Sequence, residues 1–299
     1  MTHLLDRVPK HGRISVIRLR SLGDCVLTTP ALQLLKQYRP DLHLEMVVEP
    51  RFAGVFAGNP DVDTVVARPS SANLVLNLHG GTRSMLLSMA AHADFRAGFA
   101  HHTFSWIYSH RIPRAQQILG VERAVHTAEH LASAMFYLGV PQADIPRARL
   151  LARAGPATES YAVLHPFASA PEKAWPVQNF VELARRLREQ GLPSHIVAGP
   201  EDNVKPFASH EILKGAPLEQ VKNLMAGAEL FIGNDSGPAH IAAAFGVPVV
   251  VLFGPSDPVT WAPWKTEARV LTSPDTIKNI LLENVWAAAT ELRRKTKRG

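Results

Sequence analysis

Short apolar runs alternate with longer amphipathic segments along most of the chain. Short runs of apolar, often β-branched residues predict buried strands, and apolar residues spaced three and four positions apart predict helices. In the first half, strands are predicted at residues 14–19, 42–48, 64–66, 74–78 and 95–99, and helices at 23–38 and 131–138. This alternation favours an α/β fold with parallel strands joined by helical crossovers.

The pattern is interrupted once, at residues 140–156. This segment has three prolines and scattered charges without periodicity, which is typical of an interdomain linker. The alternation then resumes, with predicted strands at 161–164, 194–198, 229–232, 248–253 and 269–271 and predicted helices at 177–190, 218–226, 237–245 and 275–293. We therefore expect two doubly wound units, with ligands at the carboxyl ends of the strands, in a cleft between the units.

Length and composition agree with two globular domains. The chain has 299 residues, of which 46% are apolar and 19% charged, and this balance excludes disordered, coiled-coil and collagen-like classes. Cys25 is the single cysteine, so an intrachain disulfide and a cysteine-based zinc site are excluded. The N-terminal segment has no secretory signal pattern, and the longest apolar run, 241–254, is too short to span a bilayer. We expect a cytoplasmic protein.

The net charge of +6 comes mostly from the C-terminal end. The last nine residues, ELRRKTKRG, contain five basic side chains and one acidic side chain, so the other 290 residues are close to neutral. A nucleic-acid groove is therefore not indicated, and no nucleic-acid partner is expected. The basic tail is either a solvated end or a segment attracted to anionic lipid head groups.

The first candidate site is the segment 18–24, where a predicted strand passes into a helix. Gly23 permits a tight turn, and Asp24 lies at the start of the helix. A carboxylate there can cap the helix or act as a general base. Arg18 and Arg20 alternate along the end of the strand. They either hold an anionic group of a ligand or are ordinary surface arginines.

The second candidate site is the segment 233–240, GNDSGPAH, between another strand and helix. Ser236 and Gly237 form a small-residue turn into that helix, which exposes backbone N–H groups suited to a phosphate. His240 on the first turn is a further donor to phosphate oxygens. Asp235 is expected to contact the polar part of a ligand instead, because a carboxylate and a phosphate repel each other.

Two further loops follow strands of the second half. The loop 165–175 offers a hydroxyl, Ser169, and a cation, Lys173, which can stabilise a departing diphosphate. Trp175 is better interpreted as a hydrophobic staple at the start of the next helix than as a stacking platform. Glu201, in the loop 198–202, is either a partner for ribose hydroxyls or a helix cap.

One motif is a decoy. The segment 126–130, HTAEH, matches the H-x-x-E-H pattern of some zinc proteases. The spacing identifies no third ligand, and with fourteen histidines in the chain a chance match is expected. The sequence contains no G-x-S-x-G elbow, Walker loop or G-x-G-x-x-G, so hydrolase, P-loop and dehydrogenase functions lack their usual marks.

Taken together, the loops form an ordered set of motifs. The motifs are S-x-G-D and T-x-P at 21–30, HPFASAPEKAWP at 165–176, DSGPAH at 235–240, A-x-G-x-P at 244–248 and FGPSDP at 253–258. In this order and spacing, the chain resembles glycosyltransferase family 9, the ADP-heptose:lipopolysaccharide heptosyltransferases. The resemblance extends from about residue 14 to residue 261. Phe167 departs from it, because the family often has glycine at that position.

The resemblance implies a GT-B fold, with two Rossmann-like parallel-sheet domains facing each other across a cleft. We expect an acceptor-binding domain at 1–155 and a domain for the nucleotide sugar at 156–274. Residues 275–299 would then form a C-terminal helix that packs back on the N-terminal domain, followed by the basic tail.

The resemblance also implies roles for individual residues. Asp24 matches the general base, and Lys173 matches the lysine that stabilises the leaving diphosphate. The expected donor-binding residues are Ser169, Glu201, Asp235, Ser236, Gly237 and His240. Arg18 and Arg20 are expected to bind an anionic glycolipid acceptor.

The leading hypothesis is an inverting transferase that moves heptose from ADP-heptose to the lipopolysaccharide inner core. It would use no metal or other cofactor and would work as a monomer in peripheral contact with the inner membrane. One alternative keeps the fold with a different nucleotide sugar or envelope-glycan acceptor. Another is a non-catalytic protein that binds a sugar nucleotide, although the presence of Asp24, Lys173 and His240 together argues against it.

Overall fold

The computed structural model describes residues 3–153 and 159–296. The chain divides into two compact units, Met1–Leu151 and Ala152–Gly299. The boundary therefore lies at residue 151, whereas 155 was predicted from the sequence.

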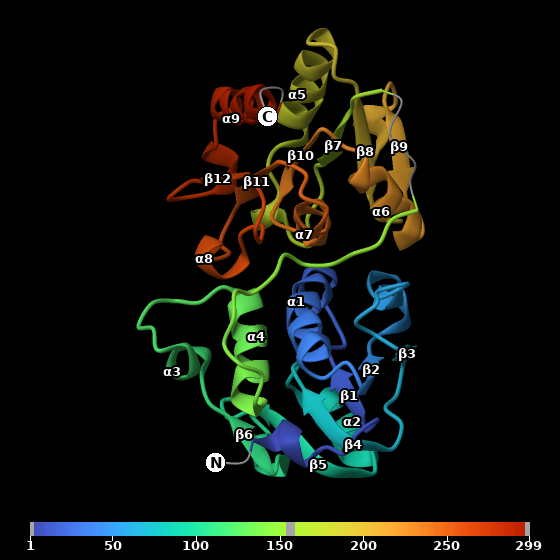
Figure 1. Cartoon of the computed structure of the whole chain (residues 1–299). Helices are drawn as coiled ribbons and strands as arrows, with labels where there is room; N and C mark the ends of the chain where they lie inside the picture. Colours follow the sequence, from blue (N-terminus) through green and yellow to red (C-terminus); the bar gives the residue numbers. More distant parts are fainter. Residues whose placement is uncertain (1–2, 154–158, 297–299) are drawn as a thin grey trace. The chain divides into compact units, whose positions relative to one another are not determined.

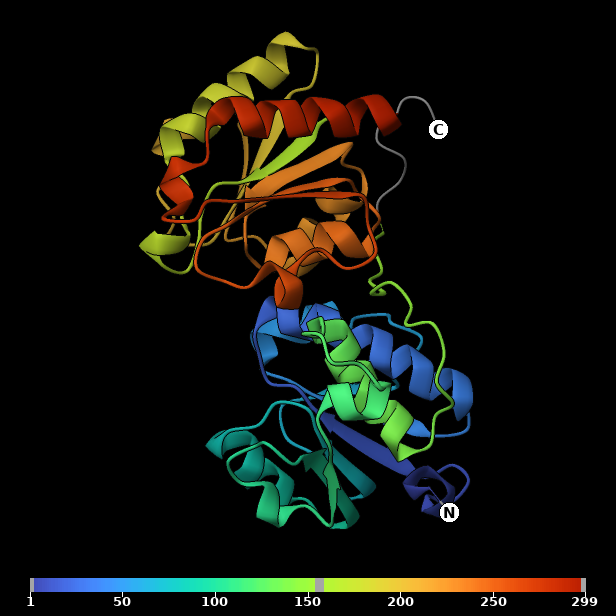
Figure 2. The same ribbon diagram turned by 90° about the vertical axis from the view of Figure 1, so that its left-hand side faces the viewer.

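The first unit is a parallel sheet covered by helices on both faces. Its strands are β1 (Arg13–Ile17), β2 (His43–Val47), β3 (Thr64–Val66), β4 (Ala72–Asn77), β5 (Ala93–Phe99) and β6 (His110–Ile112). Its helices are α1 (Leu22–Tyr38), α2 (Thr82–Ala90), α3 (Ala115–Leu119) and α4 (Thr127–Leu138). The strand order is β3-β2-β1-β4-β5-β6. Helices α1 and α4 pack together on one face and α2 covers the other (Figures 1 and 2).

Helix α1 contains a proline, yet the helix continues through it. Pro30 has no N–H to donate to the carbonyl of Val26, one turn earlier. The hydroxyl of Thr29 donates a 2.8 Å hydrogen bond to that carbonyl oxygen. The neighbouring side chain therefore supplies the missing donor, and the apolar face of α1 stays continuous.

The predicted linker belongs largely to the first unit. Residues 140–153 have no regular secondary structure, but Ile145 and Leu150 are buried. The Arg149 backbone N–H donates to the Thr29 hydroxyl at 2.9 Å, and its guanidinium pairs with Asp61 at 3.0 Å. Interpreting the whole of 140–156 as linker was wrong, because these anchors fix its first part. Residues 154–158 lie outside the described residues.

The second unit repeats this architecture. Its strands are β7 (Ala162–His165), β8 (Ser194–Ala198), β9 (Glu211–Lys214), β10 (Leu230–Asn234), β11 (Val249–Phe253) and β12 (Ala268–Thr272). Its helices are α5 (Val177–Glu189), α6 (Leu218–Ala226), α7 (Gly237–Ala244), α8 (Pro258–Trp261) and α9 (Leu282–Thr296). All strand pairs are parallel, in the order β12-β11-β10-β7-β8-β9. Helices α5 and α9 cover one face and α6 and α7 the other (Figure 2).

The strand order creates one switch point in each sheet. In the first unit the chain leaves β1 toward β2 on one side and later returns to β4 on the other side. In the second unit, β7 and β10 are related in the same way. Loops that leave two such strands diverge and open a crevice at their carboxyl ends, where ligands bind in doubly wound folds. A site is therefore expected at the carboxyl ends of β1 and β4 in the first unit and at those of β7 and β10 in the second.

The final helix packs on the core of the second unit. The buried residues Val285, Ala289 and Leu292 of α9 belong to the same hydrophobic core as Leu183 and Leu187 of α5. Arg293 also pairs with Glu229 of the second unit at 2.8 Å. The apolar stripe of α9 thus completes the cover over its own sheet. Residues 297–299 of the basic tail lie outside the described residues.

Candidate functional site

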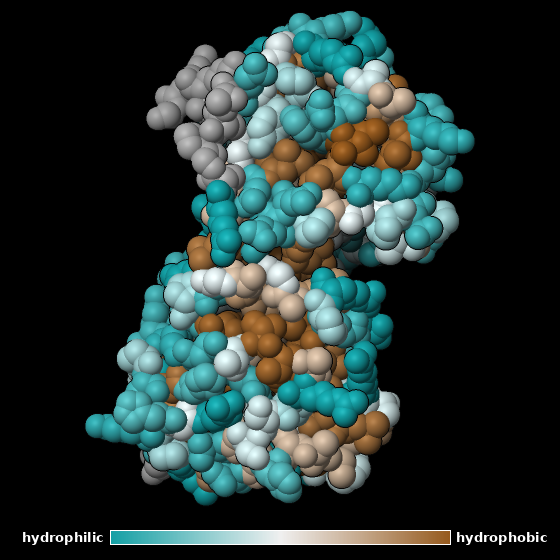
Figure 3. All heavy atoms as spheres, turned by 90° about the vertical axis from the view of Figure 1, so that its right-hand side faces the viewer, coloured by the Kyte–Doolittle hydropathy of each residue, from teal (hydrophilic) through white to brown (hydrophobic). Residues whose placement is uncertain are grey.

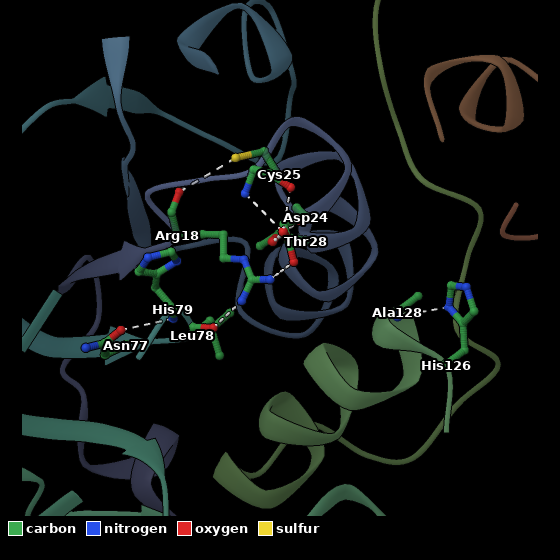
Figure 4. A network of polar contacts seen from close by, with 10 residues as sticks. Arg18, Asp24, Cys25, Thr28, Asn77, Leu78, His79, His126 and Ala128 are labelled. Carbon is green, nitrogen blue, oxygen red and sulfur yellow. Dashed lines mark hydrogen bonds and ion pairs between the residues drawn. The ribbon is translucent and has the colours of Figure 1, made fainter. Parts of the chain in front are cut away.

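The switch point of the first unit holds Asp24 in a network of polar contacts. Asp24 is the third residue of α1, and its Oδ2 accepts hydrogen bonds from the backbone N–H of Ser21 at 3.0 Å and from its hydroxyl at 2.7 Å. Arg18, directly after β1, pairs with Oδ1 through Nη2 and donates from Nη1 to the Leu78 carbonyl at 2.6 Å (Figure 4). Asp24 therefore has the capping role, one of the two alternatives considered for it, as the third residue of a capping box with Ser21.

These contacts orient the carboxylate and leave one of its hydrogen-bond acceptor positions unoccupied. Three hydrogen-bond donors in the described residues occupy Asp24, and a carboxylate offers about four acceptor positions, so one position on Oδ1 stays open. The side chains of Arg18 and Asp24 are only 12% and 14% exposed. Burial lowers the pKa of Arg18 to about 10, so its guanidinium is still charged at neutral pH. Burial also raises the pKa of the neighbouring Cys25 to about 12, which keeps it a neutral thiol.

Several residues at this switch point were missed by the sequence analysis. His79 follows β4, His102 follows β5 and His130 lies on α4. Burial, helped by the charge of Arg18, lowers the pKa of each imidazole from 6.5 to about 4. The rings are therefore neutral at pH 7. Two of these residues could have been found from the sequence, because they come shortly after predicted strands.

Arg20 differs from Arg18 in its surroundings. The Arg20 side chain is exposed, and its backbone is hydrogen-bonded by the His79 ring. Glu49, after β2, pairs with Arg51 at 2.9 Å and with Arg83 of α2 at 2.8 Å. Charged groups of both signs therefore surround Asp24 at this edge of the sheet.

The switch point of the second unit brings Lys173 and Asp235 together. Lys173 ends a short 3-10 helix after β7, and Asp235 directly follows β10. The Lys173 ammonium lies 3.5 Å from the Asp235 carboxylate, and the two side chains are 31% and 10% exposed. A Cβ at Gly254 would lie 2.5 Å from the carbonyl oxygen of Glu172, so only glycine allows that close approach beside Lys173.

The start of α7 lies beside this pair. Ser236 is the N-cap residue, but its hydroxyl donates to the Asn234 carbonyl at 3.1 Å and makes no side-chain cap. Pro238 in the first turn has no N–H to satisfy. Gly237 therefore opens a helix whose N-terminus is not capped by a side chain, as the phosphate hypothesis requires. His240 lies deeper, with 4% of its surface exposed.

The other predicted donor-binding residues lie on the surface. Ser169 is exposed in the loop after β7, and Glu201 is exposed in the turn after β8. That turn is closed by Asp202, whose carboxylate accepts from the Gly199 N–H at 2.7 Å. Glu201 is not a helix cap, because the next helical turn begins at Lys205 with Val204 at its N-cap.

Trp175 is the predicted staple. It precedes the N-cap of α5 and packs edge-on against Phe180, at 5.0 Å between ring centroids. Its indole N–H donates to the Ile280 carbonyl at 2.8 Å. Phe167, the departure from the family pattern, packs against the core of this unit and contacts Phe207 edge-on.

The HTAEH segment is a helix start. The His126 ring accepts a hydrogen bond from the Ala128 N–H at 3.1 Å (Figure 4), and Glu129 accepts one from the His126 N–H at 2.8 Å. Glu129 also pairs with Arg123. Among the residues that the structure describes, no group of three or more His, Cys, Asp or Glu side chains could hold a metal ion.

Comparison with known proteins places the chain in a family. The model of glycosyltransferase family 9 (heptosyltransferase) matches residues 68–283. The chain belongs to glycosyltransferase family 9. It is therefore an enzyme of the glycosyltransferase class, in agreement with the resemblance found in its sequence motifs.

Individual family members match over most of their length. Lipopolysaccharide heptosyltransferase 3 of Escherichia coli K12 is 26% identical, over 82% of this chain and 83% of that protein. Lipopolysaccharide heptosyltransferase 1 of E. coli O18:K1:H7 is 24% identical, over 93% of this chain and 99% of that protein.

Solved structures of the family share the fold. A glycosyltransferase family 9 protein from Veillonella parvula superposes with a TM-score of 0.86 at 24% identity, covering 96% of this chain and 98% of that one. E. coli heptosyltransferase WaaC with ADP superposes with a TM-score of 0.78 at 21% identity, covering 94% and 99%. The predicted GT-B class, with two Rossmann-like parallel-sheet domains, is confirmed.

In the described part of the chain, no helix is both long and apolar enough to cross a bilayer. On the face shown in Figure 3, polar residues (teal) cover most of each unit, with smaller apolar patches (brown) among them.

Proposed function

We propose that this family 9 enzyme is an inverting heptosyltransferase that moves heptose from ADP-heptose to the inner core of lipopolysaccharide. In this proposal the first unit binds the acceptor and the second binds the donor. The support is that both switch points carry matching chemistry. One has an oriented carboxylate, Asp24, and the other has a cation, Lys173, beside the uncapped start of α7.

In the proposed reaction, an acceptor hydroxyl attacks the anomeric carbon of the donor sugar. Asp24 takes the proton of that hydroxyl at the open position on Oδ1. The bond between the anomeric carbon and the β-phosphate oxygen breaks, and the electron pair leaves with ADP. A single displacement from the opposite face inverts the anomeric centre.

The leaving diphosphate needs positive charge as it departs. Lys173 supplies a full charge, and the N-terminus of α7 supplies backbone N–H groups and the positive end of the helix dipole. Before the donor binds, Asp235 pairs with Lys173. We assign to Asp235 the role of binding the hydroxyl groups of the donor sugar. Ser169 and His240 would donate to phosphate oxygens, and Glu201 would accept from ribose hydroxyls.

The relatives suggest the substrates. The similar E. coli proteins are named lipopolysaccharide heptosyltransferases, and WaaC was solved with ADP. Lipopolysaccharide precursors are anionic glycolipids, so we place the reaction at the cytoplasmic face of the inner membrane. The exposed Arg20 would meet an anionic group of the acceptor. Arg18 would act through Asp24, because its guanidinium is already engaged.

Two measurements test the proposal. First, ADP and ADP-heptose should raise the unfolding temperature, while UDP and GDP should not; at 100 times Kd a ligand adds about 2.7 kcal/mol of stability. Second, ADP-heptose with a deacylated inner-core acceptor should give a product that is one heptose heavier by mass spectrometry. Stabilisation by UDP or GDP alone would assign a different donor, and ADP binding without transfer to any core acceptor would favour a non-catalytic binding protein.

A further inference from the structure

Four imidazoles gather at the carboxyl ends of β4 and β5 in the first unit. We call His79, His101, His102 and His130 the histidine cluster. The centroid of the His101 ring lies 5.1 Å from that of the His102 ring and 5.5 Å from that of the His130 ring. The His130 ring stacks on Phe99 at 4.0 Å, and the His102 ring meets Phe99 edge-on at 5.6 Å. The His101 ring also contacts Phe99, at 5.3 Å between centroids, so three of the four imidazoles pack around this ring.

The backbone around the cluster is built to hold these rings. The buried Asn77 accepts hydrogen bonds from the N–H groups of His79 at 3.0 Å and Gly80 at 3.2 Å. Gly80 has a φ of +73°, and a Cβ there would lie 2.9 Å from the His102 ring. Only glycine therefore allows the loop after β4 and the loop after β5 to meet this closely.

The cluster adjoins the proposed general base. Arg18 donates to the carbonyl of Leu78, the residue before His79, and the same guanidinium pairs with Asp24. Figure 4 shows the His79 ring beside the Arg18 side chain, with Asp24 on the other side of the guanidinium. His102 and His130 also lie near enough to Arg18 for its charge to lower the pKa of each ring.

The protonation state of the rings suits hydroxyl groups. A neutral imidazole has one N–H donor and one acceptor nitrogen, and a hydroxyl group also donates once and accepts. The lowered pKa values of His79, His102 and His130 keep all three rings neutral at pH 7. Nδ1 of His102 is buried, and no described residue is its hydrogen-bond partner. The cluster therefore offers hydrogen bonds without adding charge.

We propose that His79, His102 and His130 form an acceptor subsite, in which the imidazoles hold hydroxyl groups of the acceptor sugar beside Asp24. This inference rests on the proposed function. It gives the acceptor two kinds of contact: hydroxyls bind the histidine cluster, and an anionic group binds the exposed Arg20. The histidines act as specificity-determining residues, and the proton transfer stays with Asp24.

Steady-state kinetics with ADP-heptose and a deacylated inner-core acceptor test the subsite. Loss of one neutral hydrogen bond should raise the acceptor KM roughly 3–10-fold, with the donor KM unchanged, in His102→Ala and in His130→Phe. The phenylalanine keeps the stacking on Phe99 and removes the ring nitrogens. His102→Gln, which keeps one donor and one acceptor, should restore part of the acceptor affinity. His92→Ala is the matched control, because His92 is exposed and lies at the amino end of β5, whereas the cluster lies at the carboxyl end.

The outcomes separate the subsite from the function on which it rests. Wild-type transfer with unchanged acceptor KM in both His102→Ala and His130→Phe overturns the subsite alone. A rise of donor and acceptor KM by equal factors also overturns it, since that pattern indicates general damage to the fold. A wild-type protein that transfers no heptose overturns the proposed function, and the subsite with it.

Discussion

The Lys173 ammonium lies 3.5 Å from the Asp235 carboxylate, so the cation proposed to receive the leaving group is already held by an anion. Because Lys173 stays about one-third exposed, the pair is loose enough to open when a diphosphate arrives. Asp235 thereby places the ammonium next to the start of α7 before the donor binds.

Lys173→Ala should slow the chemical step. We expect kcat to fall about 10²–10³-fold, the usual loss when one group that stabilises developing charge is removed. Lys173→Arg keeps the charge and should retain part of the rate. Single-turnover assays measure the step, and a parallel assay of the wild type with a chelator should show unchanged activity. Loss of wild-type activity in chelator would contradict the metal-independent mechanism.

Asp24→Asn should abolish transfer while ADP still binds. Asparagine can accept the Ser21 N–H but cannot take a proton from a hydroxyl, so kcat should fall about 10²–10⁴-fold. Calorimetric titration should give the same Kd for ADP in both proteins. The control is Glu49→Gln, which neutralises another carboxylate at the same edge of the sheet. Equal losses of ADP affinity and of kcat in Asp24→Asn would argue against the general base.

Arg18 variants distinguish the two roles considered for this residue. If Arg18 positions Asp24, then Arg18→Met removes a charge-assisted hydrogen bond and kcat falls roughly 10–100-fold, with the acceptor KM little changed. Arg18→Lys keeps one charged donor and should recover part of kcat. The sequence-based prediction of acceptor binding would instead be supported by a raised acceptor KM at unchanged kcat.

Stability should fall as the pH is lowered from about 6.5 toward 4. The folded protein keeps His79, His102 and His130 neutral down to a pKa of about 4, whereas in the unfolded chain they take up protons near 6.5. The unfolded state binds more protons in this window, so the free energy of unfolding decreases with decreasing pH.

One fully shifted group contributes at most about 1.4 kcal/mol per pH unit. These rings are half-buried, so solvent screening narrows the pH range over which they act, and we expect the three together to lower the free energy of unfolding by about 1 kcal/mol or more between neutral pH and pH 5. Urea unfolding at neutral pH and at about pH 5 measures the slope. His102→Gln should flatten it and His92→Gln should not; equal slopes in all three proteins would refute the assignment.

Trp175→Ala should destabilise the second unit by about 3–5 kcal/mol, because it empties a buried indole site and removes the staple of α5. Trp175→Phe keeps the ring contact but leaves the Ile280 carbonyl without its indole donor, at a cost of about 1–3 kcal/mol. Denaturant unfolding followed by circular dichroism reports both. Val259→Ala, at an exposed site of the same unit, should change stability by less than about 0.5 kcal/mol.

Much of the fold could be predicted from local pattern alone. Strands β3 and β8 and helix α6 have the predicted bounds, because each is a clear apolar or amphipathic run between turn residues. The edge strands β6 and β9 were missed, since HRI and EILK are short and partly exposed. The apolar stripe of α9 indicates that one face is buried but cannot indicate which sheet it covers; in the structure it packs on the core of its own unit.

The candidate site was predictable where a residue lies in the loop or at the helix start that follows a strand. Asp24, Lys173 and Asp235 were found in this way, and the structure places each at a switch point. His79 and His102 could have been noted in the same way, but their gathering with His130 was not predictable, because it depends on β4 pairing with β5 and on contact with α4. Strand order is set by long-range pairing, which local periodicity does not encode.

A single hydroxyl braces the helix that carries Asp24. The Thr29 hydroxyl donates a hydrogen bond to the carbonyl that Pro30 cannot reach with an N–H of its own. The same hydroxyl accepts a hydrogen bond from the backbone N–H of Arg149, which lies 120 positions later in the chain. A fragment that stops at Gly139 would lose the hydrogen bond from the Arg149 N–H to Thr29 and the ion pair between Arg149 and Asp61. The contacts that anchor the first unit therefore extend well past its last helix, to Arg149.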